Sequence, residues 1–312
     1  MMSTDMPLAS VVVLTRNRRE NVLTLMHALH HQDYPQREII LVDNCSTDGT
    51  LETVTARYPD VRVLRSPRNV GSAAYNLGMA SARGKYILMM DDDGLPSSSM
   101  WISQVIERFE SAPQLGVVAC TVRMRDTGLI AYDSPQFIPE GDLKFGFPAA
   151  AYNGTGAGLR ADAVRQVGYY PEYYFLSWIE LHLCTRLIDA GWDVRYFPDI
   201  EVWHCRASGS VNRPNTCDGL RNYVWYVWTF YPWPDVLIET GHYLASCMMR
   251  LLRQEASLTI VAKALLQAFV GWPSYARDRR PISRKTLRYL RSVRECGNLA
   301  DYADKVRLKA TV

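Results

Sequence analysis

Short apolar segments alternate with segments of helical periodicity through the first 120 residues. Apolar, β-branched segments predict strands at residues 9–14, 38–42, 61–64, 85–90 and 116–120. Apolar residues at helical spacing predict helices between them, at residues 18–31, 47–58, 72–82 and 97–110. Strands that alternate with helices of this length indicate right-handed βαβ units and a mostly parallel sheet. We therefore expect an α/β fold, in which ligands bind at the carboxyl ends of the strands.

Polar clusters follow four of these predicted strands directly. They are residues 15–17, 43–44, 66–69 and 91–93. Because the carboxyl ends of neighbouring parallel strands lie at one edge of the sheet, we expect these clusters to form a single site of nucleotide size.

The last of these clusters is the most informative. Asp91, Asp92 and Asp93 come directly after the apolar segment 86–90 and before Gly94. Adjacent carboxylates repel one another in a dry site, so a positive group is expected to hold them. Mg²⁺ or Mn²⁺ is the economical choice, because such cations use one or two carboxylates together with substrate phosphates. An exposed acidic turn is the alternative, and the polar clusters that precede the triplet favour the metal.

The middle of the chain, residues 121–215, has a mixed pattern. Residues 123–148 are rich in Gly, Pro and aromatic residues and predict loops or short strands. Residues 177–190 predict a helix, which Gly191 would end. Two short strands with a turn between them are predicted at residues 194–197 and 200–203.

Three spaced glycines in this part, Gly154, Gly156 and Gly158, invite a dinucleotide-binding interpretation. The full motif would need glycine in place of Leu159, and no opening βαβ context is present. We interpret them instead as a strand with a close backbone approach near an acceptor site.

The last hundred residues are helical and rich in aromatic residues. Charged residues interrupt the apolar segment 236–272, so its longest uncharged stretch falls short of the roughly 20 residues that a membrane span needs. Residues 277–294 contain eight Lys or Arg and one Asp. On a helix, Arg284, Arg288 and Arg291 would share one face, and Leu287, Leu290 and Val293 another. Two interpretations stay open: a helix on an anionic membrane surface, or a basic helix packed on its own domain.

Length and charge set the remaining limits. A chain of 312 residues suits one large domain with an appendage, and we divide it into residues 1–215, with halves 1–120 and 121–215, and a helical region, residues 216–312. The net charge of +3 is too close to neutral to indicate a nucleic-acid partner.

Seven cysteines without a C-x-x-C pair, and no signal peptide, predict reduced thiols in a cytoplasmic protein. Peripheral contact with the inner face of the plasma membrane stays open.

The motifs resemble a known family. They are SVVVLTRNRR at residues 10–19, IILVDNCSTDGT at 39–50, RNVG at 68–71 and GKYILMMDDD at 84–93. In this order they closely resemble the family-two glycosyltransferases of the GT-A fold, above all the branch of bacterial rhamnosyl- and galactofuranosyltransferases. Residues 175–186 and 202–204 fall where that family has its acceptor-side helix and its downstream histidine.

The resemblance implies a site for a nucleoside-diphosphate sugar. The residues that it places around the nucleotide are Thr15, Arg16, Asp43, Ser46, Arg68 and Asn69. Of these, Asp43 would receive the base through its ring N–H, with Ser46 beside it. Arg68 and Asn69 would approach the nucleotide or the diphosphate.

The resemblance also implies the reacting groups. Asp91, Asp92 and Asp93 occupy the family's ribose and metal motif, with Asp93 as the direct ligand of Mg²⁺ or Mn²⁺ and Asp91 beside it. His204 corresponds to the histidine near the metal and diphosphate. Glu180 corresponds to the carboxylate that deprotonates the acceptor hydroxyl, and the neighbouring apolar side chains would raise its pKa.

The implied activity is inverting, metal-dependent transfer of a sugar from a UDP- or dTDP-sugar to a hydroxyl acceptor. A lipid-linked glycan, a secondary metabolite and a peptide all fit as the acceptor. One alternative is a sugar nucleotidyltransferase, which residues 15–19 disfavour because they lack glycine. Another is a non-catalytic sugar-nucleotide-binding protein. The second alternative stays open because this chain has Ile179-Glu180 where the family commonly has Glu-Asp, and His182 where it often has Asp.

Overall fold

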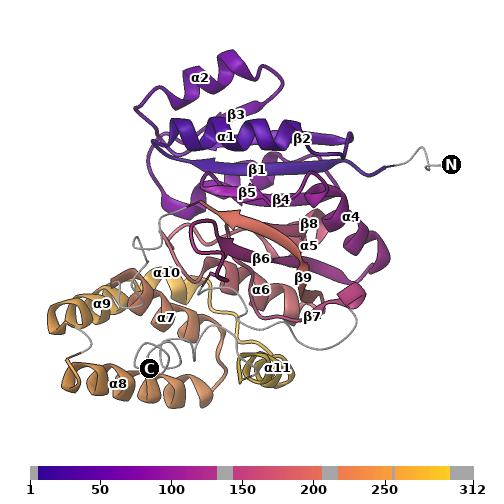
Figure 1. The fold of residues 1–312 in the computed structure, drawn as a ribbon. Coiled ribbons are helices and arrows are strands. Elements are labelled where there is room, and N and C mark those ends of the chain that lie inside the picture. Colours follow the sequence, from indigo (N-terminus) through magenta and orange to yellow (C-terminus); the bar gives the residue numbers. More distant parts are fainter. Residues whose placement is uncertain (1–5, 132–142, 206–216, 255–256, 296–312) are drawn as a thin grey trace.

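A mixed sheet runs through the molecule, with helices on both of its faces (Figure 1). The computed structural model describes residues 6–131, 143–205, 217–254 and 257–295. Part of the predicted loop segment 123–148 therefore lies outside the described residues. The strands are β1 (Ala9–Thr15), β2 (Arg37–Asp43), β3 (Arg62–Arg65), β4 (Tyr86–Asp91), β5 (Gly94–Pro96), β6 (Leu115–Met124), β7 (Phe147–Pro148), β8 (Ala157–Arg160) and β9 (Asp193–His204). The helices are α1 (Arg19–His30), α2 (Thr50–Arg57), α3 (Tyr75–Ser81), α4 (Trp101–Ser111), α5 (Ala161–Val167), α6 (Ile179–Asp189), α7 (Cys217–Phe230), α8 (Asp235–Leu252), α9 (Leu258–Val270), α10 (Trp272–Arg277) and α11 (Arg284–Glu295).

The first half of the sheet is parallel, as the sequence predicts. Strands β3, β2, β1 and β4 lie side by side in this order. Their register places Thr15 opposite Asp43, Leu14 opposite Asp91, and Asp43 opposite Arg65. The polar clusters that follow these strands therefore lie at one edge of the sheet, as predicted, and their joining into one site of nucleotide size stays a prediction.

The second half of the sheet is mixed: β6 and β9 pair in parallel, whereas β5, β7 and β8 are antiparallel to their neighbours. Strand β8 lies between β4 and β6 and is antiparallel to both. Glycines are needed here because neighbouring side chains leave no room for a Cβ. A Cβ at Gly158 would lie 2.5 Å from the Val105 side chain, and one at Gly156 would lie 2.7 Å from the Val202 side chain. The close backbone approach predicted for this segment is confirmed.

The two short strands predicted at residues 194–197 and 200–203 are one strand, β9. It pairs in parallel with β6, and the register shifts where Cys120 opposite Phe197 is followed by Thr121 opposite Glu201. The residues at Pro198 are thus a bulge in a continuous strand rather than a turn between two. A bulge bends the strand without ending it, which is why local turn signals misled the prediction.

Helices cover the sheet on both faces. In α1, Val22, Leu25, Met26 and Leu29 recur at helical spacing and are fully buried in a cluster with the inner residues of β1. Helices α3, α5 and α6 pack on the opposite face in a second cluster. Each large apolar side chain buried in this way contributes about 1.5–3 kcal/mol, which fixes the strand ends that carry the polar clusters.

The C-terminal helices extend from the α6 side of the sheet (Figure 1). Trp225 of α7 and Tyr275 of α10 join the core cluster of that face. In α11, Leu287, Leu290 and Val293 are buried in a cluster with α7 residues. The apolar face of α11 is therefore packed on the protein and is not available to a membrane, so the packed alternative holds for this helix.

Among the described residues, no helix combines the length and apolar character that a membrane span requires. The division at residue 215 stays a prediction.

Candidate active site

The loop after β1 is tied to the carboxylates that follow β4. The hydroxyl of Thr15 donates a hydrogen bond to Asp92 Oδ2 at 2.8 Å, and the backbone N–H of Arg16 approaches the same oxygen at 3.4 Å. Thr15 and Asp92 are both buried. The parallel pairing of β1 and β4 produces this contact, since it brings the two strand ends together.

Arg18 supplies the positive charge that the carboxylates require. Its Nη1 lies 2.8 Å from Asp92 Oδ1 and 2.5 Å from Asp93 Oδ2. His204, at the end of β9, places its Nε2 3.4 Å from the other oxygen of Asp93. The sequence pattern suggested a metal for this balancing role and did not point to Arg18. Arg18 could have been identified from its place in the same loop, three positions after Thr15.

The three aspartates differ in their electrostatic environments. Burial raises the pKa of Asp92, and the contacts with Arg18 and Thr15 only partly offset it. Burial would also raise the pKa of Asp93, but His204 and Arg18 outweigh it and hold that pKa below its usual value. Asp93 is thus the carboxylate held most firmly in its charged form, which suits a metal ligand.

Asp91 has different neighbours from Asp92 and Asp93, namely Tyr75 and the backbone at Gly154. The hydroxyl of Tyr75 donates to Asp91 Oδ1 at 2.7 Å. Burial, reinforced by the charge of Asp93, raises the pKa of Asp91 to about 7, although the Tyr75 hydrogen bond works in the opposite direction. Asp91 therefore lies between the donor side of the site and Glu180.

Glu180 stands in the first turn of α6 and is half-buried. Its carboxylate borders Gly154: a Cβ built on that glycine would lie 3.1 Å from Glu180 Oε1 and 3.6 Å from Asp91 Oδ2. Any side chain at position 154 would fill the space that the two carboxylates share. The predicted general base, Glu180, and the aspartate cluster are thus brought together across one glycine.

The turn before Glu180 has a strained backbone. Ser177 and Trp178 have φ values of 67° and 69°, in the left-handed region that residues other than glycine seldom adopt. Asn222 of α7 holds this turn, because its Nδ2 donates to the carbonyls of Leu176 at 2.7 Å and Ser177 at 3.1 Å. Such strain persists only where the surroundings impose it, and here it sets the direction in which α6 begins.

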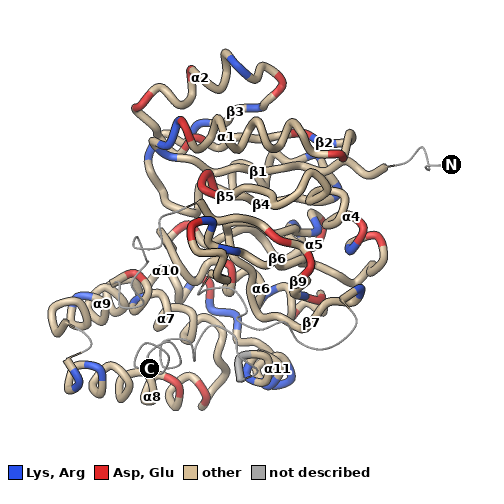
Figure 2. Tube along the Cα trace, in the orientation of Figure 1, with Lys and Arg blue, Asp and Glu red and all other residues tan. Residues whose placement is uncertain are grey.

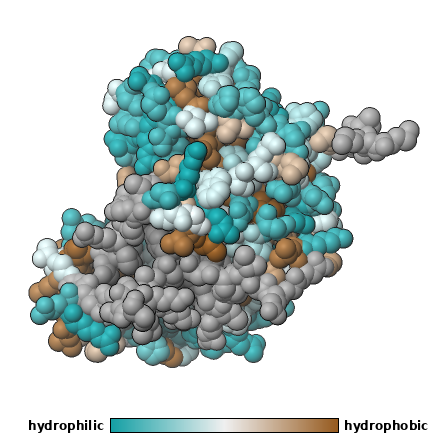
Figure 3. Space-filling model, in the orientation of Figure 1, coloured by the Kyte–Doolittle hydropathy of each residue, from teal (hydrophilic) through white to brown (hydrophobic). Residues whose placement is uncertain are grey.

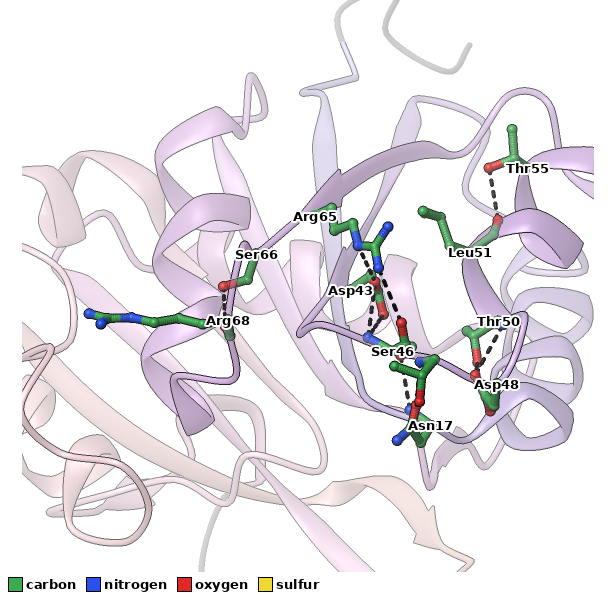
Figure 4. Close-up of polar contacts among 11 residues, drawn as sticks. Asn17, Asp43, Ser46, Asp48, Thr50, Leu51, Thr55, Arg65, Ser66 and Arg68 are labelled. Atoms are coloured by element: carbon green, nitrogen blue, oxygen red, sulfur yellow. Dashed lines mark hydrogen bonds and ion pairs between the residues drawn. The ribbon is translucent and has the colours of Figure 1, made fainter.

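The pocket predicted for the nucleobase lies at the end of β2 (Figure 4). The backbone N–H of Ser46 donates to both carboxylate oxygens of Asp43, at 3.1 and 3.3 Å. Arg65, at the end of β3, lies 3.6 Å from Asp43 Oδ2 and was not foreseen from the sequence. The Ser46 hydroxyl in turn accepts from the backbone N–H of Asn17 at 2.9 Å. Asp43 is fully buried and oriented by these contacts.

The segment with Arg68 and Asn69 has two different parts. Asn69 Oδ1 accepts hydrogen bonds from Asn44 Nδ2 at 2.9 Å and from the backbone N–H of Gly71 at 3.0 Å, so this side chain shapes its own loop. Arg68 extends away from the Asp43 and Arg65 pair in Figure 4. Arg68 therefore does not contact Asp43, and its predicted approach to the nucleotide or the diphosphate stays a prediction.

The donor set fits a metal shared with a substrate. Among the residues that the structure describes, no group of three or more His, Cys, Asp or Glu side chains forms a complete metal cage. Asp93 and His204 do offer one carboxylate and one imidazole at adjacent positions. Mg²⁺ and Mn²⁺ sites are commonly completed by substrate phosphates, so two protein ligands suffice.

The sequence matches the model of Glycosyl transferase family 2 over residues 10–168, which is half of the chain. The chain belongs to this family and is a glycosyltransferase. It is 27% identical over 213 residues to glycosyltransferase AglE of Haloferax volcanii, an alignment that covers 65% of this chain and 68% of the relative. It is 30% identical over 201 residues to galactofuranosyltransferase GlfT1 of Mycolicibacterium smegmatis, covering 58% of this chain and 65% of the relative.

Solved structures confirm the GT-A fold. The mannosyltransferase PcManGT from Pyrobaculum calidifontis, solved with GDP-Man and Mn²⁺, superposes with a TM-score of 0.60 at 18% identity over 98% of this chain and 85% of that one. GalNAc-T7, solved with UDP, GalNAc and Mn²⁺, also gives 0.60 at 15% identity over 74% and 49% of the two chains. At such identities the likeness establishes the fold alone.

Proposed function

We propose that this glycosyltransferase moves a sugar from a nucleoside-diphosphate donor to an acceptor hydroxyl by a metal-dependent, inverting displacement. The observation that carries the proposal is that Glu180 and Asp91 both lie next to Gly154, with Arg18 and His204 close to the neighbouring Asp93. A base for the acceptor and a charged site for the diphosphate thereby meet in one place.

The donor would bind along the edge formed by β2, β1 and β4. Asp43, fixed by Ser46 and Arg65, is positioned to accept a hydrogen bond from a base N–H, which a uracil or thymine ring provides. Thr15 and Arg16 line the same edge and hold Asp92 in place. UDP- and dTDP-sugars are thus the donors that this chemistry fits.

In the proposed reaction the acceptor oxygen attacks the anomeric carbon as the bond from that carbon to the diphosphate oxygen breaks. Glu180 takes the hydroxyl proton, and the nucleoside diphosphate leaves with the bonding electrons. Asp93 and His204 would hold Mg²⁺ or Mn²⁺, and such an ion stabilises the negative charge that develops on a leaving diphosphate. Arg18 lies beside the same carboxylates and can share in neutralising that charge.

Relatives and structural neighbours support a nucleoside-diphosphate donor and a divalent metal. PcManGT was solved with GDP-Man and Mn²⁺, and GalNAc-T7 with UDP and Mn²⁺. One relative, 25% identical over 214 residues, is an N-acetylglucosaminyl-diphospho-decaprenol L-rhamnosyltransferase of Mycobacterium tuberculosis. Its name is consistent with a lipid-linked acceptor among those that the sequence leaves open.

Thermal unfolding with a panel of nucleoside diphosphates and their sugars, with and without Mn²⁺, tests the donor assignment. A ligand at a hundredfold excess over its Kd should stabilise the protein by about 2.7 kcal/mol. Product analysis then tests the reaction. Transfer, or slow donor hydrolysis, should release nucleoside diphosphate; release of pyrophosphate would instead indicate nucleotidyl transfer. Donor binding without any turnover would favour a non-catalytic sugar-nucleotide-binding protein.

A further inference from the structure

Two helices of the C-terminal region carry apolar stripes on their outer faces. In α8 the stripe recurs at helical spacing, and its exposed members are Leu237, Ile238, Leu244, Met248, Met249 and Leu252. In α9 the exposed members are Leu258, Leu266, Phe269 and Val270. Several are strongly exposed, with Leu252 at 70%, Leu258 at 69% and Phe269 at 79%. Exposed apolar surface of this extent marks an interaction site.

The opposite faces of both helices pack against the rest of the protein. Cys247 of α8 and Val261 and Ala264 of α9 form one buried cluster with Leu220 of α7. The outer stripes are therefore not needed to hold the helices on the protein. Figure 3 shows brown, apolar surface in this lower-left part of the molecule, where Figure 1 places α8 and α9.

Among the described residues of α8, α9 and the turn after α8, the exposed charged side chains are positive. Arg253, just after α8, and Lys263 of α9 are exposed. The carboxylates of α8 are engaged within the protein, because Asp235 pairs with Arg284 and Arg291 of α11 and Glu239 accepts from the Tyr223 hydroxyl. Figure 2 shows further basic residues along α11, next to α8.

Two tryptophans stand where α8 begins and where α9 ends, and both pack against Trp228 of α7. Trp233 precedes α8 and Trp272 opens α10, and both are exposed. Indole rings favour the boundary between water and lipid headgroups, because they combine an apolar body with one N–H donor. Apolar stripes, cations at their margins and exposed tryptophans together characterise helices that lie in the plane of a membrane interface.

We propose that the outer face of α8 and α9 docks on an anionic lipid surface without crossing it. A second copy of the chain is the weaker candidate, since an isologous contact would bring two positively charged faces together. A bilayer with anionic headgroups offers the opposite charge and accepts the apolar side chains. This inference goes beyond the proposed function and does not depend on it.

The docked surface would lie close to the acceptor side of the site. Helix α7 carries both α8 and α9 through Leu220, and its Asn222 holds the turn that precedes Glu180. Docking would therefore fix the base-bearing end of α6 relative to the lipid surface.

Vesicle flotation of the full chain tests the proposal. We expect binding to phosphatidylcholine vesicles that contain phosphatidylglycerol, weaker binding to phosphatidylcholine alone, and loss of binding at high salt. The α9 variant Leu258→Ser with Phe269→Ser should bind at least about tenfold more weakly. The matched control is Leu129→Ser, because Leu129 is 68% exposed and belongs to the turn after β6 rather than to these helices. It should bind like the wild type.

Charge reversal gives an independent readout. Lys263→Glu should weaken binding to the anionic vesicles at least about fivefold, since each basic residue near the surface contributes about 1 kcal/mol. Arg57→Glu, an exposed change of equal charge in α2, should have little effect. If the α9 variant does not fold by circular dichroism, Leu244→Ser with Leu252→Ser in α8 takes its place.

Three results would overturn the proposal. The wild type could stay unbound with anionic vesicles at low salt, or the stripe variant could float as well as the wild type. Sedimentation could also show a dimer that the stripe substitutions dissociate, with no vesicle binding. The last result would assign the face to a second copy of this chain.

Discussion

The carboxylates of Glu180 and Asp91 both border Gly154, where a Cβ would lie 3.1 Å from the first and 3.6 Å from the second. Glu180 comes from the start of α6 and Asp91 from the end of β4, so segments far apart in the sequence meet at this glycine. The arrangement depends on the absence of a side chain at position 154. In the proposed reaction it would place a proton acceptor beside the site in which the diphosphate charge develops.

Replacement of Glu180 by Gln should retain donor binding and lower turnover by roughly a hundred- to ten-thousandfold, because the amide cannot accept the acceptor proton. The amide is nearly isosteric, so the thermal unfolding midpoint should change little. Glu172→Gln, an exposed change a few residues earlier, is the matched control. If Glu180→Gln kept turnover within a few-fold of the wild type when chemistry limits the rate, another residue would be the base.

Removal of the Arg18 side chain should leave Asp92 and Asp93 without their cation. We expect Arg18→Ala to lower the free energy of unfolding by about 1–2 kcal/mol in the presence of a chelator, less than for a fully buried pair. The Arg18 side chain is 42% exposed, which is the reason for the smaller figure. Mn²⁺ should then stabilise the variant more than the wild type, because the ion replaces the missing charge.

Urea unfolding with and without Mn²⁺ measures both effects of Arg18. Arg19→Ala serves as the control, because Arg19 pairs with the exposed Glu20 rather than with the aspartates. An Arg18→Ala variant that Mn²⁺ stabilises no more than it does the wild type would show that the ion and Arg18 do not share these carboxylates.

Asn222 should act on catalysis through the position of Glu180. Asn222→Ala removes the donor to the carbonyls of Leu176 and Ser177 and should lower kcat by about ten- to hundredfold, with the donor Kd unchanged. Asn222→Asp keeps the volume and loses the same N–H donors, so it should share the kcat defect. A purely structural role would instead lower stability and leave kcat of the folded fraction intact.

His182 should make the protein sensitive to acid. It is buried between Tyr174 and Phe230, and its ring nitrogens have no hydrogen-bond partner within the described part of the chain. Burial therefore holds the pKa of His182 well below its usual 6.5. The unfolded chain binds a proton there below about pH 6.5 and the folded chain does not, so stability falls as the pH drops through that range.

The acid effect can be isolated by comparison with His182→Leu. Between about pH 6.5 and pH 5.5 the wild type should lose about 1 kcal/mol more of its unfolding free energy than the variant loses. Equal losses in the two proteins would mean that His182 is protonated, or partnered, in the folded state.

Local sequence patterns were sufficient for the first half of the fold. Alternating strands and helices placed Thr15, Asp43 and the aspartates at one sheet edge, and the register confirms it. The antiparallel insertion of β8 was not predictable, because strand order depends on long-range packing. The bulge at Pro198 was interpreted as a turn for the same reason, since the parallel partner β6 decides whether the strand continues.

The sequence predicted the acidic residues of the candidate site but missed basic residues that pair with them. The sequence indicated a positive group beside the aspartates and suggested a metal, which stays a proposal, but it did not identify Arg18 as a cation that pairs with Asp92 and Asp93. Arg65 beside Asp43 was likewise missed, because side-chain pairing between separate strands leaves no local signature. In α11 the amphipathic pattern was real, but such a pattern does not distinguish a protein partner from a lipid one.

Calorimetric titration of UDP and dTDP into the protein, with Mn²⁺ and then with a chelator, tests the account most directly. The wild type should bind one of them at least about tenfold more tightly with Mn²⁺, and Asp93→Asn should lose this difference. Asp162→Asn, an exposed aspartate in α5, should retain it. Nucleotide affinity that is indifferent to the metal in the wild type, or a metal effect that survives in Asp93→Asn, would contradict the proposed metal-dependent donor site.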